Sequence, residues 1–144
     1  MKLAIVNGPN LNMLVYRERE HYGSLSYDEL IEEIKDNIPK KITVTTFFQS
    51  NSEGAIIDFL HKITKEKYDA LIINPGAYAH YSYAIYDALL IFQGYKIEVH
   101  LSDIYKREEF RRNLVTAGAC HNVISGLGIK SYLNALDEVD NLIR

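Results

Sequence analysis

Five short apolar runs divide the chain, and each is rich in β-branched residues of the kind found in buried parallel strands. They cover residues 2–6, 42–48, 70–73, 96–100 and 122–125. Four of the runs are followed by a polar or turn-forming residue (Asn7, Gln49, Asn74 and Gly126), and the fourth run ends at the polar His100. The pattern predicts five strands that stop at polar positions.

Between these runs the apolar residues recur three and four positions apart, which indicates amphipathic helices. Ser26 and Glu29 form a capping box at the start of the first helix, which Pro39 ends. The second helix carries its apolar face on Ile56, Ile57, Leu60 and Ile63. A third is expected over 81–92, ending before Gly94.

The last helix is predicted over 130–143, with Leu133, Leu136, Val139 and Ile143 on one side. Asp103 is expected to cap a shorter helix that carries Arg107 and Arg111.

This regular alternation of strands and helices indicates an α/β fold, a three-layer sandwich with helices on both faces of a parallel sheet. For five strands the flavodoxin-like order 2-1-3-4-5 is the expected topology, with a switch point between strands one and three. A chain of 144 residues is most simply one domain, 1–144. Ligands of such sheets bind outside the carboxyl ends of the strands.

Composition narrows the function classes. The chain is 47% hydrophobic and 24% charged, with a formal net charge of −3, which argues against a general nucleic-acid binder. No apolar run approaches the roughly 18 residues of a membrane span, and the residues before the first strand are not expected to act as a secretion signal. The single Cys120 permits neither an internal disulfide nor a thiolate metal site, so a cytoplasmic setting is expected.

The chemistry-bearing residues gather at the predicted strand ends. Asn74 ends the third run and is followed by the turn pair Pro75-Gly76, with His80 shortly after. These two residues are expected near the ligand, although capping a strand and a helix would explain them equally well. In the fourth run Glu98 and His100 point to the same face, where a carboxylate can orient an imidazole for general acid catalysis. The alternative is a satisfied polar pair at the edge of the sheet.

After His100, the backbone N–H groups of Leu101 and Ser102 lead toward a helix N-terminus that favours an anion such as a carboxylate. Arg111 is then placed to reach a hydroxylated or anionic substrate. For Arg107 we expect instead a solvated position near acidic neighbours.

The connection from the first run to Gly23 is long for a compact α/β domain and is typical of an active-site lid, here about 15–25. It carries Arg17 and Tyr22. An ordinary tyrosine, with a pKa of about 10, is a poor base unless cationic neighbours favour its ionised form. Spacing alone does not bring these two side chains together, and an ordinary loop aromatic is the simpler interpretation.

Several motifs, however, resemble type II 3-dehydroquinate dehydratase over nearly the whole chain and in order. They are IVNGPNLNML (5–14), REREHYG (17–23), FFQSNSEGAIIDFLH (47–61), IINPGAYAH (72–80) and IEVHLSDIYKREEFR (97–111). The resemblance implies a cofactor-free and metal-free hydro-lyase of the shikimate pathway. It would convert 3-dehydroquinate to 3-dehydroshikimate through an enolate.

The resemblance also implies residue roles. Tyr22 would remove the proton beside the ketone with the help of Arg17, and His100, paired with Glu98, would protonate the departing hydroxyl. Asn10 and Asn74 would hold polar groups around the enolate. The remaining substrate contacts would come from His80, Asp87, Arg111 and the backbone of Leu101 and Ser102.

The chain departs from the family pattern at a few positions. The family usually has Gly at Val15, Pro at Arg19, Arg at Tyr86 and Asn at Asp103, and other residues over 113–117. We expect these changes to affect rate, affinity or subunit contacts without removing a catalytic group. The family implies a homo-oligomer, a dodecamer built as a tetramer of trimers.

The sequence leaves two other classes of function to consider. A receiver or an FMN-binding module would need an acidic cluster or a Ser/Thr-rich phosphate loop after the first strand, where this chain has Asn7 and NGPNLNML. A degenerate homologue that keeps the fold as a binding protein is the second alternative.

Overall fold

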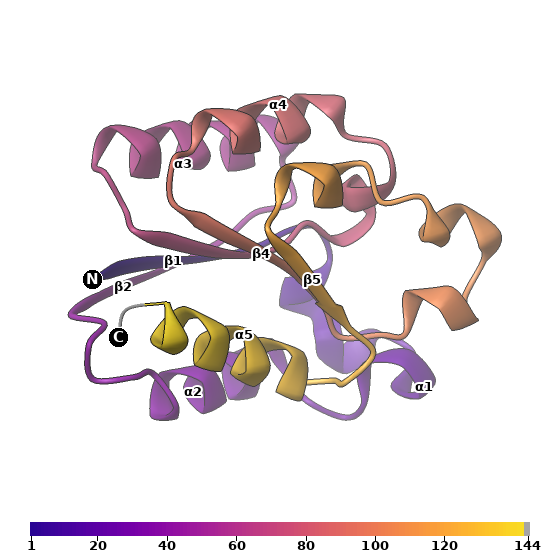
Figure 1. Ribbon diagram of the computed structural model, residues 1–144. Coiled ribbons are helices and arrows are strands. Elements are labelled where there is room, and N and C mark those ends of the chain that lie inside the picture. The colour runs from indigo at the N-terminus through magenta and orange to yellow at the C-terminus, as the bar shows by residue number, and fades with distance from the viewer. Residues whose placement is uncertain (143–144) are drawn as a thin grey trace.

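The computed structural model describes residues 1–142, so the expectation for Ile143 lies outside the described residues. A five-stranded parallel sheet forms the centre of the molecule (Figure 1). Its strands are β1 (Lys2–Asn7), β2 (Val44–Gln49), β3 (Ala70–Asn74), β4 (Tyr95–His100) and β5 (Asn122–Ser125). The order β2-β1-β3-β4-β5 confirms the flavodoxin-like topology expected from the sequence.

The register of the sheet brings the polar strand ends together. Asn7 of β1 lies opposite Asn74 of β3, and β4 runs beside β3 to end at His100. Since all strands are parallel, these side chains meet at one edge of the sheet, next to the switch point between β1 and β3.

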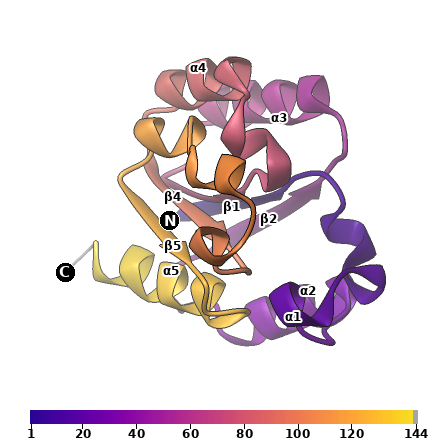
Figure 2. The ribbon, with the colours of Figure 1, turned by 90° about the vertical axis from the view of Figure 1, so that its right-hand side faces the viewer.

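Helices cover both faces (Figures 1 and 2). α2 (Tyr27–Asp36) and α5 (Lys130–Asn141) pack on one face, and α3 (Glu53–Lys65) and α4 (Tyr83–Ile91) pack on the other. Each face has its own apolar core. Successive side chains of the central strands point alternately into one core and into the other. The strands are therefore held rigidly, and they fix where their last residues point.

Serine caps begin three of the helices. The side chains of Ser26, Ser52 and Ser82 accept hydrogen bonds from the backbone N–H three residues later. The helix expected over 81–92 begins only after Ser82. Before it, Gly76–His80 forms a 3₁₀ helix (η2), which places His80 in the connection rather than at a helix cap.

The single short helix expected after Asp103 is wrong. The segment contains two 3₁₀ helices, η3 (Ile104–Lys106) and η4 (Glu109–Arg112), separated by two residues, the extended Arg107 and Glu108. Asp103 does cap the first of them, since its carboxylate accepts from the N–H of Tyr105 at 3.2 Å. Because the helix is interrupted, Arg107 and Arg111 do not share one helix face.

The predicted lid has local structure of its own. It consists of a 3₁₀ segment, η1 (Leu11–Tyr16), and one helical turn, α1 (Arg19–Tyr22), which ends at Gly23 with a positive φ of 71°. Leu11 and Leu14 are buried in the same core as α2. Figure 1 shows α1 at the right-hand side of the molecule, on the side of the carboxyl ends of the strands.

Among residues 1–142, no helix combines the length and the apolar character that crossing a membrane requires.

Candidate active site

A small cavity of about 20 Å³, partly open to solvent, lies over the carboxyl ends of β3 and β4. Polar and charged side chains from four separate segments line it: Arg17, Tyr22, Asn74, His80, His100, Ser102, Arg107 and Arg111. Gly76 and Leu101 also border it.

Two guanidinium groups contact the hydroxyl of Tyr22. Arg17 Nη2 donates to the phenol oxygen at 2.6 Å, and Nη1 of Arg107 donates to the same oxygen. The carbon Cζ of Arg17 also lies 3.9 Å from the centroid of the tyrosine ring. Two cationic donors thus converge on one phenol oxygen, so the lid tyrosine is not an ordinary loop aromatic.

The expectation of a solvated Arg107 is wrong. Its side chain is only 5% exposed, and its Nη1 also approaches Ser102 Oγ at 3.4 Å. Its Nε is buried without a hydrogen-bond partner among the described residues and lies 4.0 Å from Glu108 Oε2. The extended backbone at residue 107 gives the side chain this inward position. No periodicity signals it, because the chain leaves the helix at this residue.

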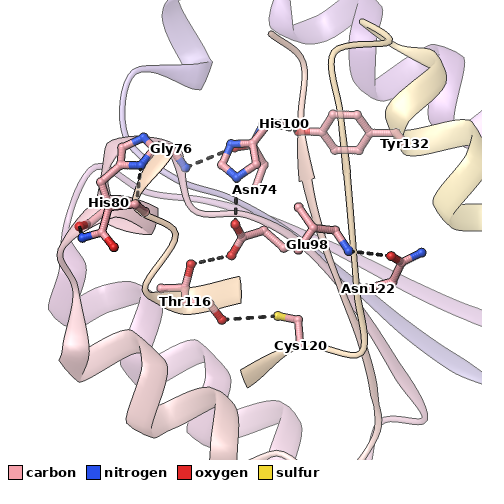
Figure 3. A network of polar contacts seen from close by, with 11 residues as sticks. Asn74, Gly76, His80, Glu98, His100, Thr116, Cys120, Asn122 and Tyr132 are labelled. Atoms are coloured by element: carbon pink, nitrogen blue, oxygen red, sulfur yellow. Dashed lines mark hydrogen bonds and ion pairs between the residues drawn. The ribbon is translucent and has the colours of Figure 1, made fainter. Parts of the chain in front are cut away.

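His100 and Glu98 form the pair expected from their alternation on β4. His100 Nε2 lies 2.8 Å from Glu98 Oε2, and both side chains are buried. Thr116 donates its hydroxyl to the other carboxylate oxygen (Figure 3). Since Nε2 faces the carboxylate, Nδ1 is the imidazole nitrogen left for the cavity that His100 lines.

His80 also lines the cavity, and its hydrogen bond fixes its tautomer. Its Nδ1 lies 3.0 Å from the carbonyl oxygen of Asn113, which can only accept, so Nδ1 carries the proton. Burial lowers the pKa of His80 below its usual value, and the nearby His100 and Arg111 act in the same direction. His80 is therefore neutral near pH 7, with Nε2 free to accept a hydrogen bond.

A buried chain of hydrogen bonds orients the side chain of Asn74. Its Nδ2 donates to the hydroxyl of Tyr132 at 3.0 Å, and that hydroxyl donates to Asn7 Oδ1 at 2.5 Å. Asn74 Oδ1 accepts from the N–H of Gly76 at 3.1 Å. The amide is thus fixed, and one N–H of Nδ2 is left to serve the cavity.

A family model described as dehydroquinase class II matches residues 1–140 of the chain. The chain belongs to this family.

Dehydroquinases similar to this chain match over almost its full length. The 3-dehydroquinate dehydratase of Caldicellulosiruptor saccharolyticus is 54% identical over 135 residues, which cover 94% of this chain and 93% of that protein. That of Clostridium perfringens is 50% identical over 144 residues and covers 100% of both chains. The crystal structure of the type II dehydroquinase from Butyrivibrio crossotus has a TM-score of 0.93 at 45% identity and covers 97% of each chain.

Most of the residues to which the dehydroquinase motifs assign a role line the cavity, but Asn10 and Asp87 do not. Leu101, Ser102 and Arg111 border it, with Arg111 Nε also bound to Glu108 at 2.5 Å. Asn10 does not line it: this residue is exposed, has a left-handed φ of 69°, and donates its N–H to Asn51. Asp87 is exposed on α4, also outside the lining of this cavity.

We predict that His80 in the folded protein has a pKa below that of free histidine, so that it stays neutral to a lower pH. Its neutral form is the one that the fold favours, so its contribution to stability is present above the unfolded pKa and is lost as the pH falls. Two-dimensional ¹⁵N–¹H spectra across a pH titration should show the Nδ1–H tautomer at pH 7. An imidazolium at His80 at that pH would contradict this assignment, and His61 on α3 serves as the exposed reference.

The single thiol is expected to be inert in the folded protein. Burial, together with the charge of Glu98, raises the pKa of Cys120 to about 12. Because the thiolate is the reactive form, an aromatic disulfide reagent at pH 8 should modify the native chain at least about 100-fold more slowly than the urea-unfolded chain. Equal rates, followed by absorbance, would show that Cys120 is accessible and ionises readily.

Proposed function

We propose that this chain catalyses the reversible dehydration of 3-dehydroquinate to 3-dehydroshikimate and water, in the shikimate route to aromatic amino acids. One observation supports this above the rest: a phenol bound by two arginines lines the same cavity as an imidazole backed by a buried carboxylate. This gives a base and an acid for one substrate, which an elimination of water requires.

Tyr22, as tyrosinate, would remove the proton on the carbon next to the ketone. Arg17 and Arg107 stabilise the negative charge on the phenolate before transfer, and they remain beside the site as the charge moves into the enolate. Asn74, with its fixed amide, donates to a polar group of that enolate. The role of Asn10 in holding the same groups requires its side chain to turn toward the cavity.

His100 would then give its Nδ1 proton to the departing hydroxyl. The carbon–oxygen bond breaks, the electrons of the enolate form the conjugated double bond, and the hydroxyl leaves as water. Glu98 would accept the Nε2–H of His100, which orients the ring for the transfer.

The substrate carboxylate would bind at the backbone N–H groups of Leu101 and Ser102, where Arg107 adds positive charge nearby. Neutral His80 would accept a hydrogen bond from a substrate hydroxyl through Nε2. Arg111 would contact another hydroxyl, while Glu108 holds its Nε.

The test is turnover by the purified protein. With 3-dehydroquinate and EDTA present, we expect the ultraviolet absorbance of the conjugated enone to appear, since no step above uses a metal or an organic cofactor. A sample from which EDTA is omitted should give the same rate. A folded protein that binds 3-dehydroquinate without forming the enone would instead be the degenerate binding protein considered from the sequence.

We further propose that the chain works in the cytoplasm as a dodecamer of four trimers. Asp87 supports an assembly: it is exposed outside this cavity, so it can reach substrate only if α4 of one copy lies near the cavity of another. Tyr81 and Tyr83, 58% and 69% exposed beside it, offer apolar surface for that contact. Light scattering at the concentration of the assay should give twelve times the chain mass. A monomer with full turnover would contradict both the dodecamer and the role of Asp87 in a neighbouring cavity.

A further inference from the structure

We propose that Thr116 is a positioning residue of the acid step: its hydroxyl holds Glu98 so that this carboxylate keeps His100 aimed at the departing hydroxyl. The inference rests on the roles proposed above for Glu98 and His100. Thr116 itself does not line the cavity.

The contacts form a short chain (Figure 3). Thr116 Oγ1 donates to Glu98 Oε1, while the second oxygen, Oε2, lies 2.8 Å from His100 Nε2. Thr116 and Glu98 are both 0% exposed, and His100 is 5% exposed. Each carboxylate oxygen therefore has one partner, in a region that bulk water does not reach.

The direction of the threonine hydrogen bond follows from chemistry. An ionised carboxylate has only acceptors, so the hydroxyl must donate. Without that donor, Oε1 would be left buried and unpaired, which is unfavourable for a charged group. The carboxylate would then be expected to rotate, and the imidazole would lose the partner that orients it.

The backbone fixes where this hydroxyl lies. Thr116 begins η5 (Thr116–Ala119), and the preceding residue, Val115, donates its N–H to the carbonyl of Ala79 at 2.7 Å. On the other side, Cys120 Sγ donates to the carbonyl oxygen of Thr116 at 3.7 Å. A threonine has few χ1 rotamers, so a fixed backbone gives its hydroxyl a defined direction.

The same segment also serves the second imidazole of the cavity. Asn113 accepts from His80 Nδ1 through its carbonyl at 3.0 Å and donates its side-chain amide to the carbonyl of His80 at 3.2 Å. Residues 113–116 thus hold His80 directly, through Asn113, and His100 indirectly, through Thr116 and Glu98. Of these contacts, only the hydroxyl of Thr116 acts on the charged group that orients the acid.

The matched variants are Thr116→Val, which keeps the shape but removes the donor, and Thr116→Ser, which keeps the donor. We expect the valine variant to lose about tenfold or more in kcat with KM within about twofold, because the acid step is impaired while the substrate contacts remain. The serine variant should stay within about threefold of the wild type in kcat. Equal losses in both would assign the effect to packing and overturn the proposal.

A second variant tests whether threonine acts through the imidazole. In a His100→Gln background, Thr116→Val should cause no further loss of turnover; a full additional tenfold loss would overturn the proposal. In ¹H spectra of the folded wild type, the Nε2–H proton of His100 should resonate far downfield, and Thr116→Val should shift it while Thr116→Ser should not. If the valine variant does not fold, Thr116→Ala and Thr116→Ser carry the same comparison.

The two levels of failure are distinguishable. A His100→Gln variant with wild-type turnover would overturn the proposed acid and this inference together. A His100→Gln variant that loses turnover, beside a Thr116→Val variant that keeps it, would overturn only the role of Thr116.

Discussion

Replacing Tyr22 by phenylalanine is expected to lower kcat by about 10³-fold, which is within the range for loss of a general base. The change removes only the oxygen to which Arg17 and Arg107 donate, and leaves the ring that packs against the core of α2 and α5. Substrate binding uses other groups, so KM should change by less than about threefold. Steady-state formation of the enone measures both constants.

The matched control for that variant is Tyr16→Phe. Tyr16 lies in the same lid and is 80% exposed, so loss of its hydroxyl should leave kcat unchanged. Circular dichroism of both variants should be that of the wild type. Full turnover by the Tyr22→Phe variant would exclude this phenol as the base.

Replacing Arg107 by glutamine is expected to lower kcat by about 100-fold, the effect of losing a buried, charged donor to the reacting phenolate. Arg107 also approaches Ser102, where the substrate carboxylate is proposed to bind, so KM should rise as well. Lysine at this position keeps the charge but not the planar set of donors, and should recover only part of the activity.

Arg112→Gln is the control for that experiment. Arg112 is exposed, lies in the same segment, and donates to the carbonyl of Tyr105 at 3.2 Å rather than lining the cavity. Its replacement should leave kcat and KM within about twofold of the wild type. If Arg107→Gln behaved like this control, the solvated position expected from the sequence would be the better description of Arg107 in solution.

The Glu98–His100 pair on β4, proposed above as the acid of the reaction, shows what strand geometry allows a sequence to predict. Glu98 and His100 are two residues apart on a strand, so alternation alone places them on one face, and the 2.8 Å contact confirms it. The N-terminal cap at Ser26 and the switch point beside β1 and β3 follow from equally local rules, and both are confirmed.

The lid required a different kind of information. The five-residue separation of Arg17 and Tyr22 gives no fixed distance in an irregular loop, and their assignment came from the family motif. The 2.6 Å contact depends on the turn at α1 and on the packing of Leu11 and Leu14 beneath it. The fold of this segment is therefore set by its contacts with the core, as well as by its own sequence.

By itself, the sequence determined the five-stranded α/β architecture, the edge of the sheet that carries the polar strand ends, and the family to which the motifs belong. These features depend on hydrophobic periodicity and on contacts within a few residues. Only the tertiary structure decided that Arg107 joins Tyr22, 85 residues away in the chain, and that Thr116 supports Glu98. Both contacts depend on where irregular segments cross the sheet edge, and that is set by packing against distant strands rather than by any local repeat.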